Sequence, residues 1–473
     1  MSESLLRYEK LAGELAGMIA GGVLQHGDRL PSVRRLSQER RLSVSTVVQA
    51  LRHLEDRGLV EARPQSGYFV TRPRALRAEP RVGVTPSGPM PVDISQRLVR
   101  VLQAGARSGV APLAAALPAP ELLPLAALHR LYAGVARRHT GLLAGGSHIN
   151  MDETALVRQL VRRSLAWGGP LDGSEIVITN SCTEALGLCL RAATRPGDTV
   201  AVESPAYYLM LQLLESLGLK ALEIPTDPRS GMSVEALDLA SRQGRVAACL
   251  LVSNGSNPLG CQMPDEKKRQ LAALTAARDI AVIEDDIYGD LHFTEQRPWP
   301  IKAFAQAGNV MLCSSFSKCL SPSLRIGFVA AGKYRSAIAL QKTISSGGTN
   351  PLTQHVLAEY LESGAYERHL RSLRRSYQQQ VAAMQAAVAR YFPVASRISQ
   401  PQGGYVLWVE LPEHIDTTAC YETALAEGVA YVPGELFSAS GLYRNCLRLN
   451  CGNPHTPEIE DAVRRLGRIF CAC

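Results

Sequence analysis

A lysine stands just after a short apolar segment, where its amine could act as a nucleophile. Lys318 closes the run Ser314-Ser315-Phe316-Ser317-Lys318, which follows the strand-like residues 310–312. Burial among hydroxyl and apolar groups, with Arg325 nearby in the chain, would disfavour the charged form of the amine. A neutral amine of this kind can form a Schiff base with an aldehyde. Because a single lysine is usually a solvated surface charge, other segments must supply the rest of a site.

Four earlier strand-like segments also end in polar or aromatic side chains. Apolar runs at 176–179, 200–202, 247–252 and 281–283 alternate with helical stretches, which predicts a mostly parallel sheet covered on both faces. Ligands of such sheets bind beyond the carboxyl ends of the strands. The residues that follow the four segments are, in chain order, Ser181, Cys182 and Thr183, then Tyr207, then Asn257, then Asp285 and Tyr288.

These side chains have complementary chemical uses. Hydroxyls and free N–H groups at the start of a helix can hold a phosphate, and an aromatic ring can cover a planar ligand. Asn257, Asp285 and Tyr288 add an amide, a carboxylate and a phenol. Each residue alone has a structural explanation as core, turn or helix cap. Five consecutive strand ends that carry all of them, with the lysine last, are the parts that a pyridoxal phosphate site requires.

The first 70 residues predict a helix-turn-helix followed by a hairpin. Apolar residues at helical spacing between Leu5 and Ile19 predict a first helix. Ser32 and Ser43 are placed to cap a second and a third helix, and Gly58 is placed to end the third. Two short apolar runs within 59–70, joined by a turn with Pro and Gly, predict a β-hairpin.

The third predicted helix divides into an apolar and a polar face. Val47, Leu51 and Leu54 share one face, and the opposite face is short, polar and rich in donors. Such a face can enter the major groove of DNA, with nearby arginines on the phosphates. A small helical interaction domain whose polar face is only solvated is the alternative. The candidate DNA-binding residues are Arg34, Arg35, Ser43, Ser45, Thr46, Gln49, Arg52, Arg63 and Gly67.

Charge is unevenly distributed along the 473 residues. The net charge is +8, and residues 1–81 hold 14 Lys and Arg against 9 Asp and Glu. An excess of this kind suits a polyanionic partner, although solvated charged faces are its commoner cause. Between 72 and 92, five prolines and no apolar periodicity predict an exposed, extended linker between two domains that can move relative to each other.

Composition excludes several classes of protein. With 46% hydrophobic and 20% charged residues, the chain is neither disordered, collagen-like nor a coiled coil. No apolar run reaches the roughly 20 residues that a membrane helix needs, and the first residues do not resemble a signal peptide, so a cytoplasmic protein without a membrane partner is expected. Eleven cysteines without metal-type spacing predict free thiols and no metal site.

The N-terminal region resembles the winged helix of GntR-type regulators, which implies a double-stranded DNA partner. The match departs at Val44 and Val48, where the family usually has polar or basic side chains. The resembling segments are Gly27-Asp28-Arg29-Leu30-Pro31-Ser32-Val33-Arg34, Leu42-Ser43-Val44-Ser45-Thr46-Val47, Leu54-Glu55-Asp56-Arg57-Gly58-Leu59-Val60 and Ser66-Gly67-Tyr68-Phe69-Val70.

From about Pro91 to the C-terminus, the chain resembles the fold-type I, aspartate aminotransferase-like family of pyridoxal phosphate proteins. The resemblance implies that Lys318 is the catalytic lysine of the internal aldimine and that Asp285 pairs with the pyridinium nitrogen. Arg448, in Leu447-Arg448-Leu449-Asn450, matches the arginine that binds a substrate carboxylate. The stretch 144–151 lacks the aromatic residue that the family places there. The remaining cofactor-binding residues implied are Ser181, Cys182, Thr183, Tyr207, Asn257, Tyr288, Ser315, Ser317 and Arg325.

Together these features imply an α/β fold class, an N-terminal winged helix-turn-helix plus a fold-type I domain. That domain should have a mostly parallel sheet in its large part and a smaller α+β C-terminal part. The expected boundaries are 1–72 for the GntR-type winged helix, 73–92 for the linker and 93–473 for the aminotransferase class I/II-like domain, whose small part starts at about 350. This arrangement resembles the MocR group of GntR-type regulators.

The favoured hypothesis is a homodimeric transcriptional regulator that binds DNA and pyridoxal 5'-phosphate. It would sense an amino compound through aldimine exchange at Lys318. The alternative is an active aminotransferase with an accessory DNA-binding domain, and a third option is a DNA-binding dimer without cofactor. Sustained turnover with amino acids and a 2-oxo acid would favour the enzyme, whereas a single spectral shift would favour the sensor.

Overall fold

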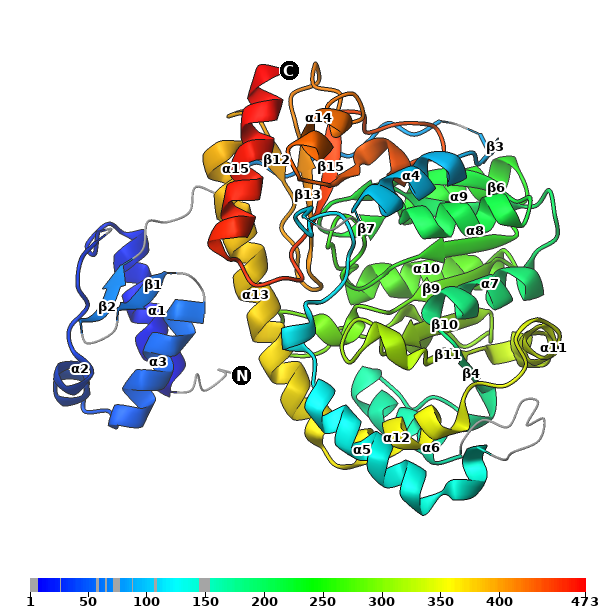
Figure 1. Ribbon diagram of the computed structural model, residues 1–473, viewed down its shortest axis with the longest axis horizontal. Helices are drawn as coiled ribbons and strands as arrows, with labels where there is room; N and C mark the ends of the chain where they lie inside the picture. The colour runs from blue at the N-terminus through cyan, green and yellow to red at the C-terminus, as the bar shows by residue number, and fades with distance from the viewer. Residues whose placement is uncertain are drawn as a thin grey trace. The chain divides into compact units, whose positions relative to one another are not determined.

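The chain divides into two compact units, Met1–Leu76 and Arg77–Cys473. Figure 1 shows the smaller unit in dark blue and the larger one from lighter blue to red. The predicted helix end at Gly58, part of the hairpin turn and the stretch 144–151 lie outside the described residues. This computed structural model describes residues 7–25, 27–56, 59–63, 66–70, 77–86, 88–105, 109–143 and 154–473.

Over its described residues, the N-terminal unit contains three helices and an antiparallel hairpin. Its elements are α1 (Arg7–Ala20), α2 (Val33–Arg40), α3 (Val44–Asp56), β1 (Val60–Arg63) and β2 (Gly67–Val70). In the hairpin register, Val60 lies opposite Val70 and Arg63 opposite Gly67. The predicted helix-turn-helix and hairpin are confirmed.

Local capping explains where these helices begin and end. The Ser32 side chain accepts a hydrogen bond from the Arg35 N–H, and the Ser43 hydroxyl accepts one from the Thr46 N–H. Arg41, with a φ of 51°, turns the chain between α2 and α3. The unit has its own hydrophobic core, formed by Leu11, Ala12, Leu15, Ile19, Leu30, Leu36, Val47, Ala50, Leu51, Leu54, Val60 and Val70.

A mixed sheet forms the centre of the large unit. Its strand order is β3-β6-β5-β8-β9-β10-β11-β4, with β7 beside β6. The five strands from β6 to β10 in this order are parallel to one another, whereas β3 and β7 are antiparallel to β6, and β11 is antiparallel to both β10 and β4. The strands are β3 (Met90–Pro91), β4 (Ile176–Thr179), β5 (Thr199–Ser204), β6 (Lys220–Asp227), β7 (Gly231–Met232), β8 (Ala248–Leu251), β9 (Ala281–Asp285), β10 (Val310–Ser315) and β11 (Gly327–Ala330).

Helices cover both faces of this sheet, as predicted. In β5, Val200 and Val202 belong to one buried cluster and Ala201 belongs to another, because successive side chains of a strand point to opposite faces. The helices α7 (Cys182–Ala193) and α8 (Tyr208–Ser216) contribute to the first cluster, and α9 (Val234–Gln243) and α10 (Asp265–Ala277) contribute to the second.

The C-terminal part has an antiparallel sheet of its own, with the strand order β12-β13-β15-β14. The 27-residue helix α13 (Ala365–Tyr391) and the helix α15 (Pro457–Ala472) run beside this sheet (Figure 1). The remaining elements are β12 (Arg397–Ile398), β13 (Val406–Glu410), β14 (Val432–Pro433), β15 (Cys446–Asn450), α4 (Ser95–Gly105), α5 (Leu125–Arg138), α6 (Thr154–Ser164), α11 (Arg335–Ser345), α12 (Pro351–Glu362) and α14 (Tyr421–Ala426).

The predicted linker differs from expectation over the part that the structure describes. From Arg77 to Thr85 the segment is extended and partly exposed, as predicted, with Val84 89% exposed, but hydrogen bonds hold it on the large unit, so it is not a free tether. The Arg77 guanidinium donates to the carbonyls of Ala389 and Phe392, and Ile398 N–H donates to Ala78 O. Backbone groups that are distant in the sequence hold this segment, and its proline-rich composition does not reveal them.

The strand β6 was not predicted from the sequence. It begins at Lys220, contains Glu223 and Pro225, and ends at Asp227, so its apolar pattern is broken. Its long pairing with β5, from Thr199–Lys220 to Ser204–Pro225, stabilises it. Among the described residues, no helix is long and apolar enough to cross a membrane.

Candidate coenzyme pocket and DNA-contacting surface

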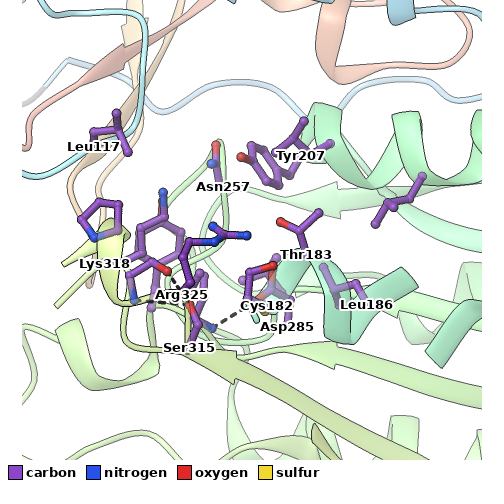
Figure 2. A pocket seen from close by; sticks show the side chains of 18 residues that line it. Leu117, Cys182, Thr183, Leu186, Tyr207, Asn257, Asp285, Ser315, Lys318 and Arg325 are labelled. Atoms are coloured by element: carbon purple, nitrogen blue, oxygen red, sulfur yellow. Dashed lines mark hydrogen bonds between the residues drawn. The ribbon is translucent and has the colours of Figure 1, made fainter. Parts of the chain in front are cut away.

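One pocket at the carboxyl ends of the strands collects the predicted cofactor residues. All eleven of them line it, although they come from segments up to 144 residues apart in the chain. In Figure 2, Tyr207 and Asn257 project from one side and Ser315 from the other. The lining comprises Leu117, Ser181, Cys182, Thr183, Leu186, Tyr207, Leu209, Leu213, Val252, Asn257, Asp285, Ile287, Tyr288, Ser315, Ser317, Lys318, Pro322 and Arg325.

Lys318 lies just beyond β10, and its amine is inside the pocket. Nζ donates a hydrogen bond to the carbonyl oxygen of Ala116 at 2.6 Å. Burial, assisted by the positive charge of Arg448, lowers the pKa of the Lys318 amine to about 8, while Asp285 opposes the shift. The amine is therefore easier to neutralise than an exposed lysine, as its predicted burial implied, but the cation that contributes is Arg448 and not the predicted Arg325.

Asp285 is the last residue of β9, and its carboxylate is held by two donors. The Cys182 thiol donates to Oδ1 at 3.2 Å, and the Ile287 N–H donates to the same oxygen at 3.1 Å. Burial raises the pKa of Asp285 to about 6, while these two hydrogen bonds favour the ionised form. Near neutral pH the carboxylate therefore remains mostly ionised.

The start of α7 and the end of β10 form the hydroxyl-rich side of the pocket. Ser181 is the N-cap of α7 and accepts a hydrogen bond from the Glu184 N–H at 3.0 Å. The Ser315 hydroxyl donates to Ser317 Oγ at 3.2 Å. Gly327 allows β11 to approach α7, because a Cβ there would lie 2.6 Å from the Ser181 carbonyl carbon. Arg325, exposed and with a φ of 50°, completes this side.

The Tyr288 hydroxyl is buried and has no hydrogen-bond partner in the structure. Burial raises the pKa of this phenol well above its usual value, so it is protonated and available as a donor. Its ring packs edge-on against Tyr405, with 5.6 Å between the centroids. Gly404 makes room for the ring, since a Cβ there would lie 3.2 Å from Tyr288 Cδ1. An orphaned buried hydroxyl of this kind points to a ligand group in the pocket.

Arg448 on β15 is fully buried and lies beside the pocket, outside its lining. One terminal nitrogen donates to Asn257 Oδ1 at 3.4 Å, and the other donates to the Ala114 carbonyl. The Nε of Arg448 is buried without a partner. Each terminal nitrogen uses one of its two N–H groups, so the guanidinium keeps the Nε–H and two further N–H donors for other acceptors.

Several pocket residues were not predicted from the sequence. Leu186, Leu209 and Leu213 are apolar helix residues, and nothing in their type distinguishes them from the rest of the core. The backbone carbonyls of Ala114 and Ala116, which bind the two buried cations, have no sequence signal because every residue has a carbonyl. Only tertiary structure identifies these acceptors.

In the N-terminal unit, most of the predicted DNA-contacting side chains are exposed on α2 and α3. Ser45, Gln49 and Arg52 are exposed on α3, and Thr46 is partly exposed. Arg34 is exposed on α2. These positions agree with a polar recognition face.

Three of the predicted DNA-contacting residues already make hydrogen bonds within the N-terminal unit. Arg35 Nε donates to Glu39 at 2.7 Å, and Arg63 donates to Glu61 and packs over the Phe69 ring. The Ser43 hydroxyl caps α3 and bonds to Ser45 and Thr46. Gly67, with a φ of +101°, permits the hairpin tip.

Comparison with known proteins defines the class to which this architecture belongs. The aminotransferase class I and II family matches residues 154–466, and the bacterial regulatory proteins of the gntR family match residues 7–70. The chain is 39% identical to two uncharacterized HTH-type transcriptional regulators of Escherichia coli, YjiR and YdcR. Both alignments cover 98% of this chain, with 98% of YjiR and 99% of YdcR.

Solved structures agree with this assignment for the large unit. A multiple substrate aminotransferase from Thermococcus profundus is 31% identical, with a TM-score of 0.73, over 79% of this chain and 94% of that one. LysN, the α-aminoadipate aminotransferase of Thermus thermophilus, complexed with N-(5'-phosphopyridoxyl)-L-leucine, is 29% identical, with a TM-score of 0.72, over 79% and 94%.

The fold and the pocket thus define a winged helix-turn-helix joined to an aminotransferase-like domain. The chain belongs to the aminotransferase class I and II family over most of its length and, as a whole, to the MocR-type regulators that combine this domain with a GntR-type one.

Proposed function

We propose that this protein is a pyridoxal 5'-phosphate-dependent, DNA-binding transcriptional regulator that senses an amino compound at Lys318. One observation carries the proposal. All eleven cofactor-binding residues that the family resemblance implies line a single pocket, in a chain that also has a winged helix. The pocket is suited to a phosphorylated, planar, aldehyde-bearing coenzyme, and the winged helix is suited to double-stranded DNA.

The residues present fit the coenzyme. The unpartnered Tyr288 hydroxyl can donate to a ring oxygen, and the Asp285 carboxylate can accept from a protonated ring nitrogen. The Tyr207 ring lines the same pocket and can cover a planar ligand. For the phosphate, the proposed ligands are the start of α7 and the opposing hydroxyls, namely Ser181, Cys182, Thr183, Ser315, Ser317 and Arg325.

The residues of this chain have separate tasks in the proposed site. When bound, the coenzyme supplies an aldehyde that condenses with primary amines and a ring that withdraws electrons. Lys318 provides an amine that loses its proton readily, because burial and Arg448 disfavour the charge. Asp285, held ionised by Cys182 and Ile287, keeps a proton on the ring nitrogen. Arg448 offers its buried Nε to a carboxylate of the amino compound.

The exposed polar face of α3 is the proposed base-reading surface. Ser45, Gln49 and Arg52 would reach base edges, while Arg34 and the hairpin tip would contact phosphates. We further propose a homodimer, because palindromic DNA sites pair with two-fold symmetric proteins. The second candidate function, aminotransferase activity, is favoured by the complete set of pocket residues.

The experiment uses the purified full chain, Lys318→Ala and the matched surface variant Lys333→Ala. The unmodified chain and Lys333→Ala should show visible coenzyme absorbance and incorporate the coenzyme covalently after borohydride reduction, whereas Lys318→Ala should not. DNA from upstream of the gene should bind with an affinity that changes when coenzyme and amines are added. DNA binding that is indifferent to both would contradict the sensing role, and sustained turnover with a 2-oxo acid would favour the enzyme.

A further inference from the structure

One segment contacts both Lys318, in the pocket, and Arg448, beside the pocket. We name residues 111–119 the strap. The Ala116 carbonyl accepts from Lys318 Nζ at 2.6 Å, and the Ala114 carbonyl accepts from Arg448. Leu117 of the strap also lines the pocket. Two residues that act on different parts of a ligand are therefore held by two carbonyls, two positions apart in one segment.

The strap is fastened to the end of β15 by Asn450. The Asn450 Nδ2 donates to the carbonyls of Pro112 at 3.1 Å and of Leu117 at 3.3 Å, and its backbone N–H donates to Leu113 O at 2.8 Å. These acceptors lie on either side of Ala114 and Ala116. Asn450 is 2% exposed, so its hydrogen bonds are protected from water.

Gly452 fixes the strap from the same strand end. The Ala119 N–H donates to the Gly452 carbonyl at 2.9 Å. A Cβ on Gly452 would lie 2.6 Å from the Leu117 carbonyl oxygen, so a larger residue there must displace the strap. Asn450 Oδ1 accepts a hydrogen bond from the Gly452 N–H at 2.9 Å. We name this hydrogen-bonded pair, Asn450 and Gly452, the clamp.

The contact with the strap leaves the Nε–H of Arg448 free to bind a ligand. Ala114 O and Asn257 Oδ1 each accept a hydrogen bond from one terminal nitrogen of Arg448. Among the described residues, the Nε of Arg448 is buried without a partner. A guanidinium held at its far end presents its Nε edge in one orientation, which lowers the entropy that a bound carboxylate has to remove. The Ala114 carbonyl is therefore one of the two acceptors that orient the Arg448 guanidinium.

We propose that Asn450 is a positioning residue, which holds the strap so that the carbonyls of Ala114 and Ala116 orient Arg448 and Lys318. This inference rests on the proposed function, because it assigns the ligand of that same site a carboxylate. It also predicts a separate, measurable effect on each of the two cationic side chains. Without the clamp, Arg448 loses its orientation and carboxylates bind more weakly. Lys318 loses an acceptor that stabilises its charged form, so the amine is neutralised at lower pH.

Three groups near Lys318 besides the Ala116 carbonyl influence the pKa of its amine. Arg448 disfavours its charge, whereas the Asp285 carboxylate and the Cys182 sulfur favour it. None of these three is bonded to Asn450 among the described contacts. Movement of Arg448 away from the amine would raise the pKa of Lys318, whereas loss of the Ala116 carbonyl would lower it. A titration of Lys318 that moves to lower pH on substitution of Asn450 therefore reports the Ala116 carbonyl.

The test compares Asn450→Ala and Gly452→Ala with the control Asn445→Ala. Asn445, before the other end of β15, makes an equivalent amide-to-carbonyl bond, to Leu411 O at 2.6 Å. The probe is 3-phenylpropionate, a carboxylate without an amine, measured by calorimetry on the full chain with and without coenzyme. We expect its Kd to rise about tenfold in both strap variants, the effect of losing one to two hydrogen bonds, and to change by less than about twofold in the control.

The second readout is the pH dependence of coenzyme attachment at Lys318, followed by absorbance. Its midpoint should move to lower pH in the strap variants and stay in place in the control. Should Asn450→Ala fail to fold, Gly452→Ala tests the same strap. An unchanged probe Kd in a folded strap variant, or no probe binding to the unmodified chain, would overturn the proposal. Absence of coenzyme uptake by the unmodified chain contradicts the proposed function instead, and the probe Kd without coenzyme still decides the role of Asn450.

Discussion

The thiol of Cys182, at the first turn of α7, donates a hydrogen bond to the carboxylate of Asp285, at the end of β9, with 3.2 Å between Sγ and Oδ1. The two residues are 103 positions apart in the chain. Burial raises the pKa of the Cys182 thiol well above its usual value, so the sulfur keeps its proton and acts as a donor. The Cys182 thiol thereby lowers the pKa of Asp285, the carboxylate proposed to face the coenzyme ring.

Replacing Cys182 with Ala should raise the pKa of Asp285 above its value of about 6. The thiol hydrogen bond favours the ionised carboxylate, so its loss favours the protonated form. In coenzyme-loaded protein, the pH-dependent change in visible absorbance should move to higher pH. Cys189→Ala is the matched control, because Cys189 is equally buried but contacts Cys313. An equal shift of the absorbance titration in Cys182→Ala and Cys189→Ala would argue against the hydrogen bond from Cys182 to Asp285.

Asp285→Asn should stabilise the coenzyme-free fold at neutral pH while abolishing coenzyme chemistry. The folded pKa of about 6 lies above the usual value of 3.8, so the stability that this carboxyl contributes is full below about pH 4 and is lost as the pH rises to about 6. The amide keeps an acceptor for Cys182 and cannot ionise. We expect a gain in unfolding free energy of about 3 kcal/mol at pH 7, shrinking toward zero near pH 4. Denaturant unfolding at several pH values measures it, and a pH-independent difference would contradict the linkage.

Arg448→Gln should raise the pKa of Lys318 above its value of about 8, because the guanidinium charge disfavours the ammonium form. Coenzyme attachment, which requires the neutral amine, should then have its midpoint at higher pH. The rate of absorbance change between about pH 7 and pH 10 measures this shift. Arg444→Gln, an exposed arginine paired with Asp416 just before the same strand, should leave the midpoint in place.

Glu39→Ala should strengthen binding to nonspecific DNA. Glu39 holds the exposed Arg35 at 2.7 Å, and its removal frees one cation and deletes one negative charge. Since an exposed pair of this kind contributes little to stability, folding should be unaffected. Affinity should rise about threefold to tenfold at low salt, with a steeper dependence on salt concentration. Gln49→Ala should instead weaken binding selectively to the specific site, so equal losses on all DNA would contradict its role in reading bases.

Leu51→Ala should destabilise the N-terminal unit and leave the stability of the large unit unchanged. Leu51 is fully buried in a core that consists only of residues from that unit. Loss of its side chain should cost about 2 to 5 kcal/mol, a large fraction of the stability of so small a domain. Calorimetry should show a lower first transition and an unchanged second one, with coenzyme absorbance retained. Joint destabilisation of both transitions would mean that the units do not fold independently.

Much of the candidate site followed from the sequence, because its chemistry is carried by residue types at strand ends. The alternation of apolar strands and helices indicated that residues as distant as Ser181 and Lys318 would meet at one edge of a parallel sheet. Ser32 and Ser43 indicated the helix starts of the DNA-binding unit, because helix capping depends on neighbouring residues. Where the signal is local and held in side chains, the sequence alone determined the outcome.

The tertiary structure decided everything that depends on backbone groups and on distant partners. The carbonyls of Ala114 and Ala116 hold two buried cations, yet carbonyls are present at every position and give no sequence signal. The segment that begins at Arg77 lies on the large unit because of carbonyls more than 300 residues away. Local sequence sets which groups are available, whereas long-range packing selects which of them meet, since that selection is made by the energy of the whole fold.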